Sequence, residues 1–143
     1  MSLLTIASLP RITRDELADL IQNPVADHQL AIIDVRDSDH VGGHIISSRW
    51  ISSSSLELHL PELLRTLKDV PQVVFYCALS QQRGPTSALK YARMRLATNG
   101  IDGEATVNQK ICVLEGGFVN WQEKFGKNPE LTEAYVEDIW QEY

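Results

Sequence analysis

Three short apolar runs punctuate the chain at wide intervals. They are Leu30–Val35, Gln72–Tyr76 and Lys110–Leu114, and each is nearly continuous rather than alternating. Runs of this length and kind are typical of strands buried on both faces of a parallel sheet. We therefore predict three central strands.

Helical spacing of apolar residues fills the intervals between these runs. A capping box, Thr13–Glu16, precedes the first such stretch and predicts that a helix starts there. A second helix is expected from about Leu56 to Lys68. A third is expected from Gly84 to about Ala97, with Pro85 in the first turn, where its missing N–H costs nothing. The pair Gly116-Gly117 predicts the start of a fourth, short helix.

Strands alternating with helices on this spacing predict an α/β fold, with a central parallel sheet flanked by helices on both faces. We expect one domain over residues 1–143, with its core at about 9–126. Residues 127–143 are expected to form a C-terminal amphipathic helix packed on the domain, because apolar side chains recur there at helical spacing. These side chains are Val136, Ile139, Trp140 and Tyr143.

Charge and composition exclude several classes of partner. The net charge is -6, and no Lys/Arg cluster is long enough to follow a nucleic-acid backbone. No apolar run approaches the length of a membrane span, and the N-terminus has no basic region typical of a secretory signal. Two cysteines cannot form a disulfide framework or a four-ligand zinc site. We therefore expect a reducing compartment, the cytoplasm or the nucleus, and no bound metal.

The segment Cys77–Arg83 carries the candidate chemistry: a cysteine, five residues and an arginine. The cysteine ends a predicted strand and the arginine begins a predicted helix, whose N-terminus attracts anions. Arg83 can bind two oxygens of an oxyanion in a bidentate fork. The same positive field favours the thiolate form of Cys77, which is the nucleophilic form. The expected catalytic residues are therefore Cys77 and Arg83, and the expected oxyanion donors are the backbone amides of Ala78, Leu79, Ser80, Gln81, Gln82 and Arg83.

Together with two flanking motifs, this loop resembles the rhodanese-like fold and, within it, the single-domain Cdc25-like phosphatases and arsenate reductases. One motif is Ile33–Arg36 followed by Gly43-His44-Ile45. The other is Val113–Phe118 with Trp121 behind it. The resemblance implies a rhodanese-like (Cdc25-type) domain. It also implies that Cys77 is the nucleophile, that Arg83 clamps the oxyanion, and that the seven-residue loop is wide enough for phosphate or arsenate.

Four functions follow from this resemblance. The first is a Cdc25-like protein tyrosine phosphatase that forms a Cys77 phosphoenzyme and needs no cofactor; its substrate carries phosphate, with a phosphoprotein among the candidates. The second is an arsenate reductase that uses glutathione and a glutaredoxin as co-substrates. A sulfurtransferase is favoured by Tyr76 before the cysteine but opposed by the loop length. A non-catalytic phosphate- or phosphopeptide-binding module is opposed by the presence of both Cys77 and Arg83.

Other polar residues have simpler interpretations. Asp34 is expected to pair with Arg36 or a nearby amide, and His44 to be a hydrogen-bonded structural histidine. Cys112, inside an apolar strand, is expected to be an inert core thiol, with a resolving role in disulfide exchange as the alternative. The tract Ser52–Ser55 is predicted to be a loop. Arg93 and Arg95 either attract an anionic substrate or belong to a solvated helix face.

Overall fold

The computed structural model describes residues 4–25, 29–102 and 108–141. Its centre is a five-stranded sheet in the order β1-β6-β5-β2-β4, and every pairing in it is parallel. The strands are β1 (Arg11–Ile12), β2 (Leu30–Asp34), β4 (Arg49–Trp50), β5 (Gln72–Tyr76) and β6 (Lys110–Leu114). A separate antiparallel pair joins β3 (His44–Ile45) to β7 (Thr132–Glu133).

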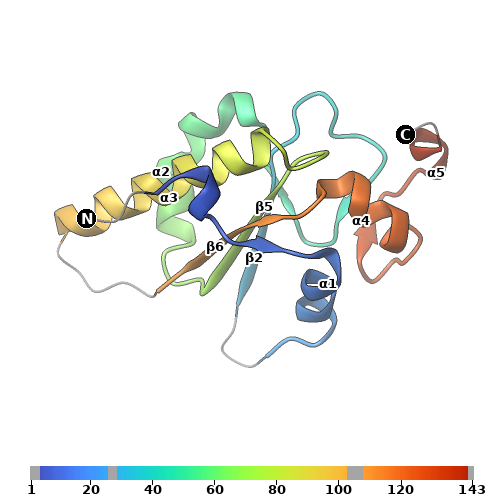
Figure 1. Cartoon of the computed structure of the whole chain (residues 1–143), viewed down its shortest axis with the longest axis horizontal. Coiled ribbons are helices and arrows are strands. Elements are labelled where there is room, and N and C mark those ends of the chain that lie inside the picture. The colour runs from blue at the N-terminus through green and yellow to red at the C-terminus, as the bar shows by residue number, and fades with distance from the viewer. Residues whose placement is uncertain (1–3, 26–28, 103–107, 142–143) are drawn as a thin grey trace.

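Helices cover both faces of the sheet (Figure 1). One face lies against α2 (Leu56–Thr66) and α3 (Arg83–Asp102), and the other against α1 (Arg14–Gln22) and α4 (Gly117–Phe125). Short 3-10 turns, η1 (Ile6–Ser8) and η2 (Ser53–Ser55), precede β1 and α2. The α/β architecture predicted from the sequence is confirmed.

Successive residues of the central strands enter opposite cores, because side chains alternate across a sheet. Val73 and Phe75 pack with α2 and α3, whereas Val74 and Tyr76 pack with α1 and α4. All five residues of β5 are buried. Burial on both faces is the physical reason that this strand shows a continuous apolar run rather than an alternating one.

Local signals in the sequence correctly predict the boundaries of several helices and strands. The Thr13 hydroxyl accepts from the amide of Glu16, and the Glu16 carboxylate accepts from the amide of Thr13, each at 3.1 Å. The helix α1 therefore begins at its predicted capping box. Strands β5 and β6 have the predicted bounds, and α3 extends beyond its predicted end near Ala97 to Asp102.

The C-terminal prediction was wrong in extent. Within the described part of residues 127–143, a turn and β7 come first, and α5 covers only Glu137–Trp140. The turn forms because the Asn128 side chain accepts from the amide of Glu130 at 2.9 Å. After β7, Ala134 adopts a left-handed φ of 56°, which bends the chain at the end of the strand. Trp140 is nevertheless buried in the core, and its indole donates to the carbonyl of Gly42 at 2.8 Å. Tyr143 lies outside the described residues.

The carboxyl ends of β2, β5 and β6 meet at one edge of the sheet, since the three strands are parallel neighbours. The segments that follow them, beginning at Val35, Cys77 and Glu115, therefore emerge side by side. Open α/β sheets bind ligands at this edge. Among the described residues, no helix is long and apolar enough to cross a membrane.

Candidate active site

The loop 77–82 leaves β5 and leads directly into α3, whose first residue is Arg83. Cys77, Ala78, Leu79, Gln81, Gln82 and Arg83 line a pocket of about 290 Å³ at this point. The structure thus brings the predicted nucleophile and the predicted clamp to one small pocket at the N-terminus of a long helix. Such a helix end presents unpaired N–H groups and a positive dipole.

The sulfur of Cys77 is held by backbone amides. The N–H of Ser80 donates to Cys77 Sγ at 3.1 Å, and the N–H of Gly84 donates to it at 3.3 Å. In return, the Ser80 hydroxyl accepts from the Cys77 amide at 3.3 Å. Ser80 adopts a left-handed φ of 55°, which turns its amide back toward the sulfur. Two N–H donors aimed at one sulfur stabilise its anionic form, because each dipole is positive toward it.

The carbonyl groups of the loop point outward to fixed partners. The amides of Phe118 and Val119, at the start of α4, donate to the carbonyls of Cys77 and Ala78 at 3.0 and 2.9 Å. Arg11 donates to the carbonyl of Ser80 at 3.0 Å. Because a trans peptide is planar, the N–H of the following residue points the opposite way.

The remaining loop amides are available to a guest. In the described part of the chain, the amides at positions 78, 79 and 81–83 donate to no protein acceptor. The sequence predicts that the amide of Ser80 binds the oxyanion, but in the structure this amide points toward Cys77 Sγ and donates to it instead. The second motif, at the start of α4, therefore supports the loop by holding its carbonyls away from the pocket.

Arg83 makes a double ion pair that no local pattern in the sequence indicates. Its two terminal nitrogens donate to the two carboxylate oxygens of Asp39 at 2.7 and 2.6 Å. Nη1 also donates to Asp37 at 3.3 Å. The hydrogen bonds from Arg83 lower the pKa of Asp39 to about 2, and Asp39 in turn raises the pKa of Arg83. Both side chains therefore stay charged near neutral pH.

Asp37 is anchored from the other side by the serine tract. The Ser53 hydroxyl and the Ser54 amide donate to its carboxylate at 2.7 and 3.1 Å. Burial acts to raise the pKa of Asp37, but these bonds and Arg83 together lower it. The tract Ser52–Ser55 thus contains the turn η2, which fixes an acidic loop beside the pocket. The signal in the sequence was Asp37-Ser38-Asp39 after β2, at the same sheet edge as the loop 77–82.

The first motif is structural, as predicted. The Arg36 guanidinium and amide donate to the carboxylate of Asp34, with the shortest contact 2.7 Å, and both side chains are fully buried. Arg36 also donates to the carbonyl of Gly43 at 2.7 Å and lies over the ring of Phe118. Tyr76, before the nucleophile, points into the opposite core, where its hydroxyl bonds Ile45 and Ser48.

Other singled-out residues lie away from the pocket. Cys112 is fully buried in the core on the opposite sheet face from Cys77, and burial raises the pKa of its thiol. His44 lies in β3, 3.5 Å from the Glu133 carboxylate. Arg93 donates to the carbonyl of Leu4, and Arg95 is buried rather than solvated and donates to the carbonyl of Lys68. Neither arginine lines the pocket at the loop.

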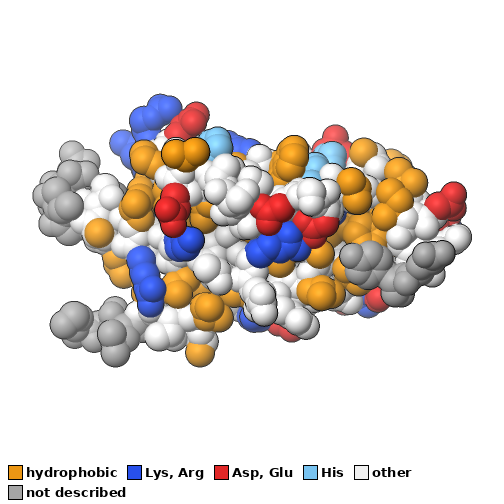
Figure 2. Space-filling view, turned by 90° about the horizontal axis from the view of Figure 1, so that it is seen from above, with side chains coloured by type: hydrophobic (Ala, Val, Ile, Leu, Met, Phe, Trp, Pro, Cys, Tyr) orange, Lys and Arg blue, Asp and Glu red, His pale blue; other side chains and the backbone are white. Residues whose placement is uncertain are grey.

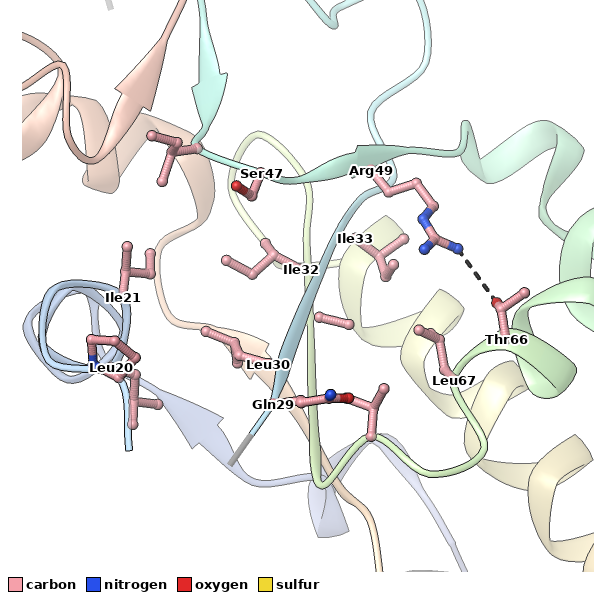
Figure 3. A pocket seen from close by; sticks show the side chains of 14 residues that line it. Leu20, Ile21, Gln29, Leu30, Ile32, Ile33, Ser47, Arg49, Thr66 and Leu67 are labelled. Carbon is pink, nitrogen blue, oxygen red and sulfur yellow. Dashed lines mark hydrogen bonds between the residues drawn. The ribbon is translucent and has the colours of Figure 1, made fainter. Parts of the chain in front are cut away.

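Figure 2 shows the molecule from above relative to Figure 1. Acidic and basic side chains meet near the middle of this face, next to uncharged polar side chains and backbone, and hydrophobic side chains lie farther out. A larger hollow of about 560 Å³ lies along β2, with α1 residues on one side and Arg49 bonded to Thr66 at its rim (Figure 3). The described residues that line it include no cysteine, histidine or acid. Its described lining therefore offers hydroxyl groups, from Ser47 and Thr66, but no thiol and no acid–base group to activate them.

Comparison with known proteins agrees with this geometry. The chain belongs to the rhodanese-like domain family, which matches residues 13–124. It is 35% identical over 120 residues to the CDC25-like phosphatase YCH1 of Saccharomyces cerevisiae, covering 76% of each chain. It is 39% identical over 106 residues to arsenate reductase 2.1 of Oryza sativa subsp. japonica, covering 73% of this chain and 64% of that protein.

A solved structure extends the likeness to the whole fold. The crystal structure of Saccharomyces cerevisiae Ygr203w, described as a homolog of single-domain rhodanese and the Cdc25 phosphatase catalytic domain, superposes with a TM-score of 0.79. The two chains are 29% identical, and the match covers 99% of this chain and 97% of that one. Relatives of this protein are thus named both as phosphatases and as arsenate reductases.

Proposed function

We propose that this protein is a Cdc25-like protein tyrosine phosphatase that acts through a covalent Cys77 intermediate. The observation that carries the proposal is the pair of amides, from Ser80 and Gly84, that donate to Cys77 Sγ within a loop that ends at Arg83. This arrangement favours an ionised sulfur beneath a site where oxyanion donors converge. The likeness to the yeast CDC25-like phosphatase supports the same reading.

The reaction would proceed in two balanced steps. The Cys77 thiolate attacks phosphorus, an S–P bond forms, and the P–O bond to the leaving group breaks as that oxygen takes a proton. Water then attacks the phosphocysteine, inorganic phosphate leaves, and the thiolate is restored. The free loop amides and Arg83 stabilise the charge on the transferring oxygens in both transition states. No cofactor is needed for either step.

Arsenate reduction is the second candidate, and a specific observation favours it. The loop 77–83 contains no carboxylic acid, and Asp39 beside it is ionised at neutral pH, so neither can protonate a leaving group. Protonated arsenate needs no such acid, because a neighbouring As–OH group passes its proton to the departing hydroxyl, which leaves as water. Cys77 would form an S–As bond, and glutathione would then attack that sulfur. The two sulfurs would become a disulfide as As(V) becomes As(III), and a glutaredoxin with a second glutathione would reduce that disulfide.

A direct comparison of activities tests the proposal. Hydrolysis of p-nitrophenyl phosphate and glutathione-dependent reduction of arsenate are measured on the intact chain, each with Cys77→Ser and Cys112→Ser. We expect phosphate release that Cys77→Ser abolishes and Cys112→Ser preserves. Arsenate reduction without phosphate release would select the second candidate. Transfer of sulfur from thiosulfate to cyanide, with neither other activity, would overturn both.

A further inference from the structure

We infer that Asp39, assisted by Asp37, is a specificity-determining residue that makes the loop prefer a protonated, singly charged oxyanion over a dianion. The preferred guests are the monoanion of a phosphate monoester and the monoanion of arsenate. The inference deepens the proposed function and rests on it, because it concerns which ionic form enters the same pocket.

Arg83 has five N–H donors, and its carboxylate partners occupy three of them. Nη1 and Nη2 each donate one hydrogen to Asp39, and Nη1 donates its second to Asp37. The two that remain, on Nε and Nη2, lie along one side of the planar guanidinium. That side is a fork suited to two oxygens of one guest. Asp39 therefore fixes the plane of Arg83, and no acceptor in the described part of the chain occupies its lateral fork.

The charge around this fork is unfavourable to a second negative charge on the guest. The two carboxylates of Asp37 and Asp39 face the one guanidinium of Arg83, so the group carries an excess of negative charge. The other charged groups near the loop are paired with one another: Arg11 with Glu115 at 3.7 Å, and Arg36 with Asp34 at 2.7 Å. His40, which follows Asp39 in the sequence, is stacked on Trp50. Burial lowers the pKa of its imidazole, so His40 adds no positive charge at neutral pH.

A protonated guest avoids this repulsion and gains a contact. A P–OH or As–OH group donates a hydrogen bond to a carboxylate, whereas a fully ionised guest cannot. The carboxylates of Asp37 and Asp39 do not line the loop pocket themselves, but they are bonded to Arg83, which does. They are about one-third exposed, at 33% and 37%, so a guest held by the fork of Arg83 would lie beside them. Each carboxylate oxygen has a second lone pair beyond the one that an existing bond uses.

The proton of the monoanionic guest also supplies the acid that the leaving group needs. The loop supplies no acid for the leaving group, but a monoanionic ester carries its own proton on a phosphoryl oxygen. As Cys77 Sγ bonds to phosphorus and the ester P–O bond breaks, that proton passes to the leaving oxygen. The alcohol or phenol departs neutral, and the phosphocysteine keeps the charges. Selecting the monoanion therefore replaces a general acid.

The test measures binding separately from turnover. Protection of Cys77 from iodoacetamide is titrated with sulfate and with inorganic phosphate, at one pH below the second ionisation of phosphate. There phosphate is a monoanion with two hydroxyls, and sulfate is a dianion with none. The proteins are the native chain, Asp39→Asn, Asp39→Glu and, as a remote control, Asp15→Asn, which removes an exposed carboxylate paired with Lys124. Both anions are compared at one pH, so changes in thiol reactivity cancel.

We expect the native chain to bind phosphate more tightly than sulfate. Asp39→Asn should reduce that preference on the order of three- to tenfold, as expected for one partly screened charge. Asp39→Glu and Asp15→Asn should keep the preference. An unchanged preference in Asp39→Asn, or equal weakening of both anions, would overturn the inference and leave the proposed function intact. Failure of both anions to protect Cys77 in every protein would instead contradict the proposed function.

Discussion

Gly117 lies against the carbonyl of Cys77 so closely that a Cβ atom at Gly117 would come within 2.5 Å of that oxygen. Its φ of 60° also falls in the region that side chains disfavour. This contact lets the start of α4 reach the loop and donate to its carbonyls. The glycine of the second motif is therefore a spatial requirement of the active loop, although it lies 40 positions away along the chain.

Gly117→Ala should accordingly damage both stability and activity. The strained backbone and the clash should lower the free energy of unfolding by about 1–3 kcal/mol, measured by urea denaturation. The phosphatase rate should fall further than stability alone explains, because the loop must shift. Gly84→Ala is the comparison for stability alone, since a Cβ there would have its nearest neighbours at 3.4 Å but would lie beside Cys77. Equal stability of Gly117→Ala and the native chain would contradict the role given to this contact.

Replacement of Arg83 should affect chemistry much more than folding. Lysine keeps the charge of Arg83 but loses the planar fork, so kcat/KM of Arg83→Lys should fall on the order of 100-fold or more. The ion pairs of Arg83 are partly exposed, so stability should change by less than about 1 kcal/mol. Arg93→Lys, on the exposed face of the same helix, should keep normal kinetics. Near-normal kcat/KM in Arg83→Lys would exclude a bidentate clamp.

The Asp39–Arg83 pair should give stability a defined pH dependence. The pKa of Asp39 falls from 3.8 to about 2 on folding, so its contribution is present above about pH 4 and is lost as pH falls through about 2. Asp39→Asn should thus be slightly less stable than the native chain at neutral pH, by under about 1 kcal/mol after screening. The difference should vanish in strong acid. A difference that persists there would indicate a cause other than ionisation.

The two cysteines should differ sharply in reactivity. Both cysteines are buried, but Cys77 is 3% exposed, lines a pocket and accepts two amide hydrogen bonds. Cys112 has no exposed surface, and burial raises the pKa of its thiol, which disfavours the thiolate. Iodoacetamide should therefore label native protein at Cys77 alone, as read by peptide mass spectrometry. Cys112 should become labelled only after denaturation. Labelling of native Cys112 at a comparable rate would contradict its place in the core.

The sequence predicted those elements whose cause is local. The strand Gln72–Tyr76 is buried on both faces and so reveals itself as an apolar run, and the capping box at Thr13 marks a helix start by its own hydrogen bonds. The two-residue strands β1, β3, β4 and β7 are too short to show any periodicity. The C-terminal spacing suggested a full helix, but a turn at Asn128 and pairing of β7 with β3 decided the chain path.

The site was predictable in its nucleophile and clamp but not in its acidic partners. Cys77 and Arg83 lie at the two ends of one short segment between β5 and α3. The order of strand, loop and helix is therefore enough to predict that they lie close together. Asp39 lies 44 positions before Arg83, and only the parallel pairing of β2 with β5 brings the two together. Likewise, no local pattern shows that the tract Ser52–Ser55 anchors Asp37. Such contacts depend on sheet topology rather than on residue spacing.

Trapping the covalent intermediate tests the central claim most directly. The native chain is mixed with an aryl phosphate, quenched in acid during turnover and digested for peptide mass spectrometry. We predict one phosphoryl group on the sulfur of Cys77, with none on Cys112 and none in Cys77→Ser. Continued hydrolysis with no phosphorylated Cys77, or with the phosphoryl group on another residue, would contradict the account.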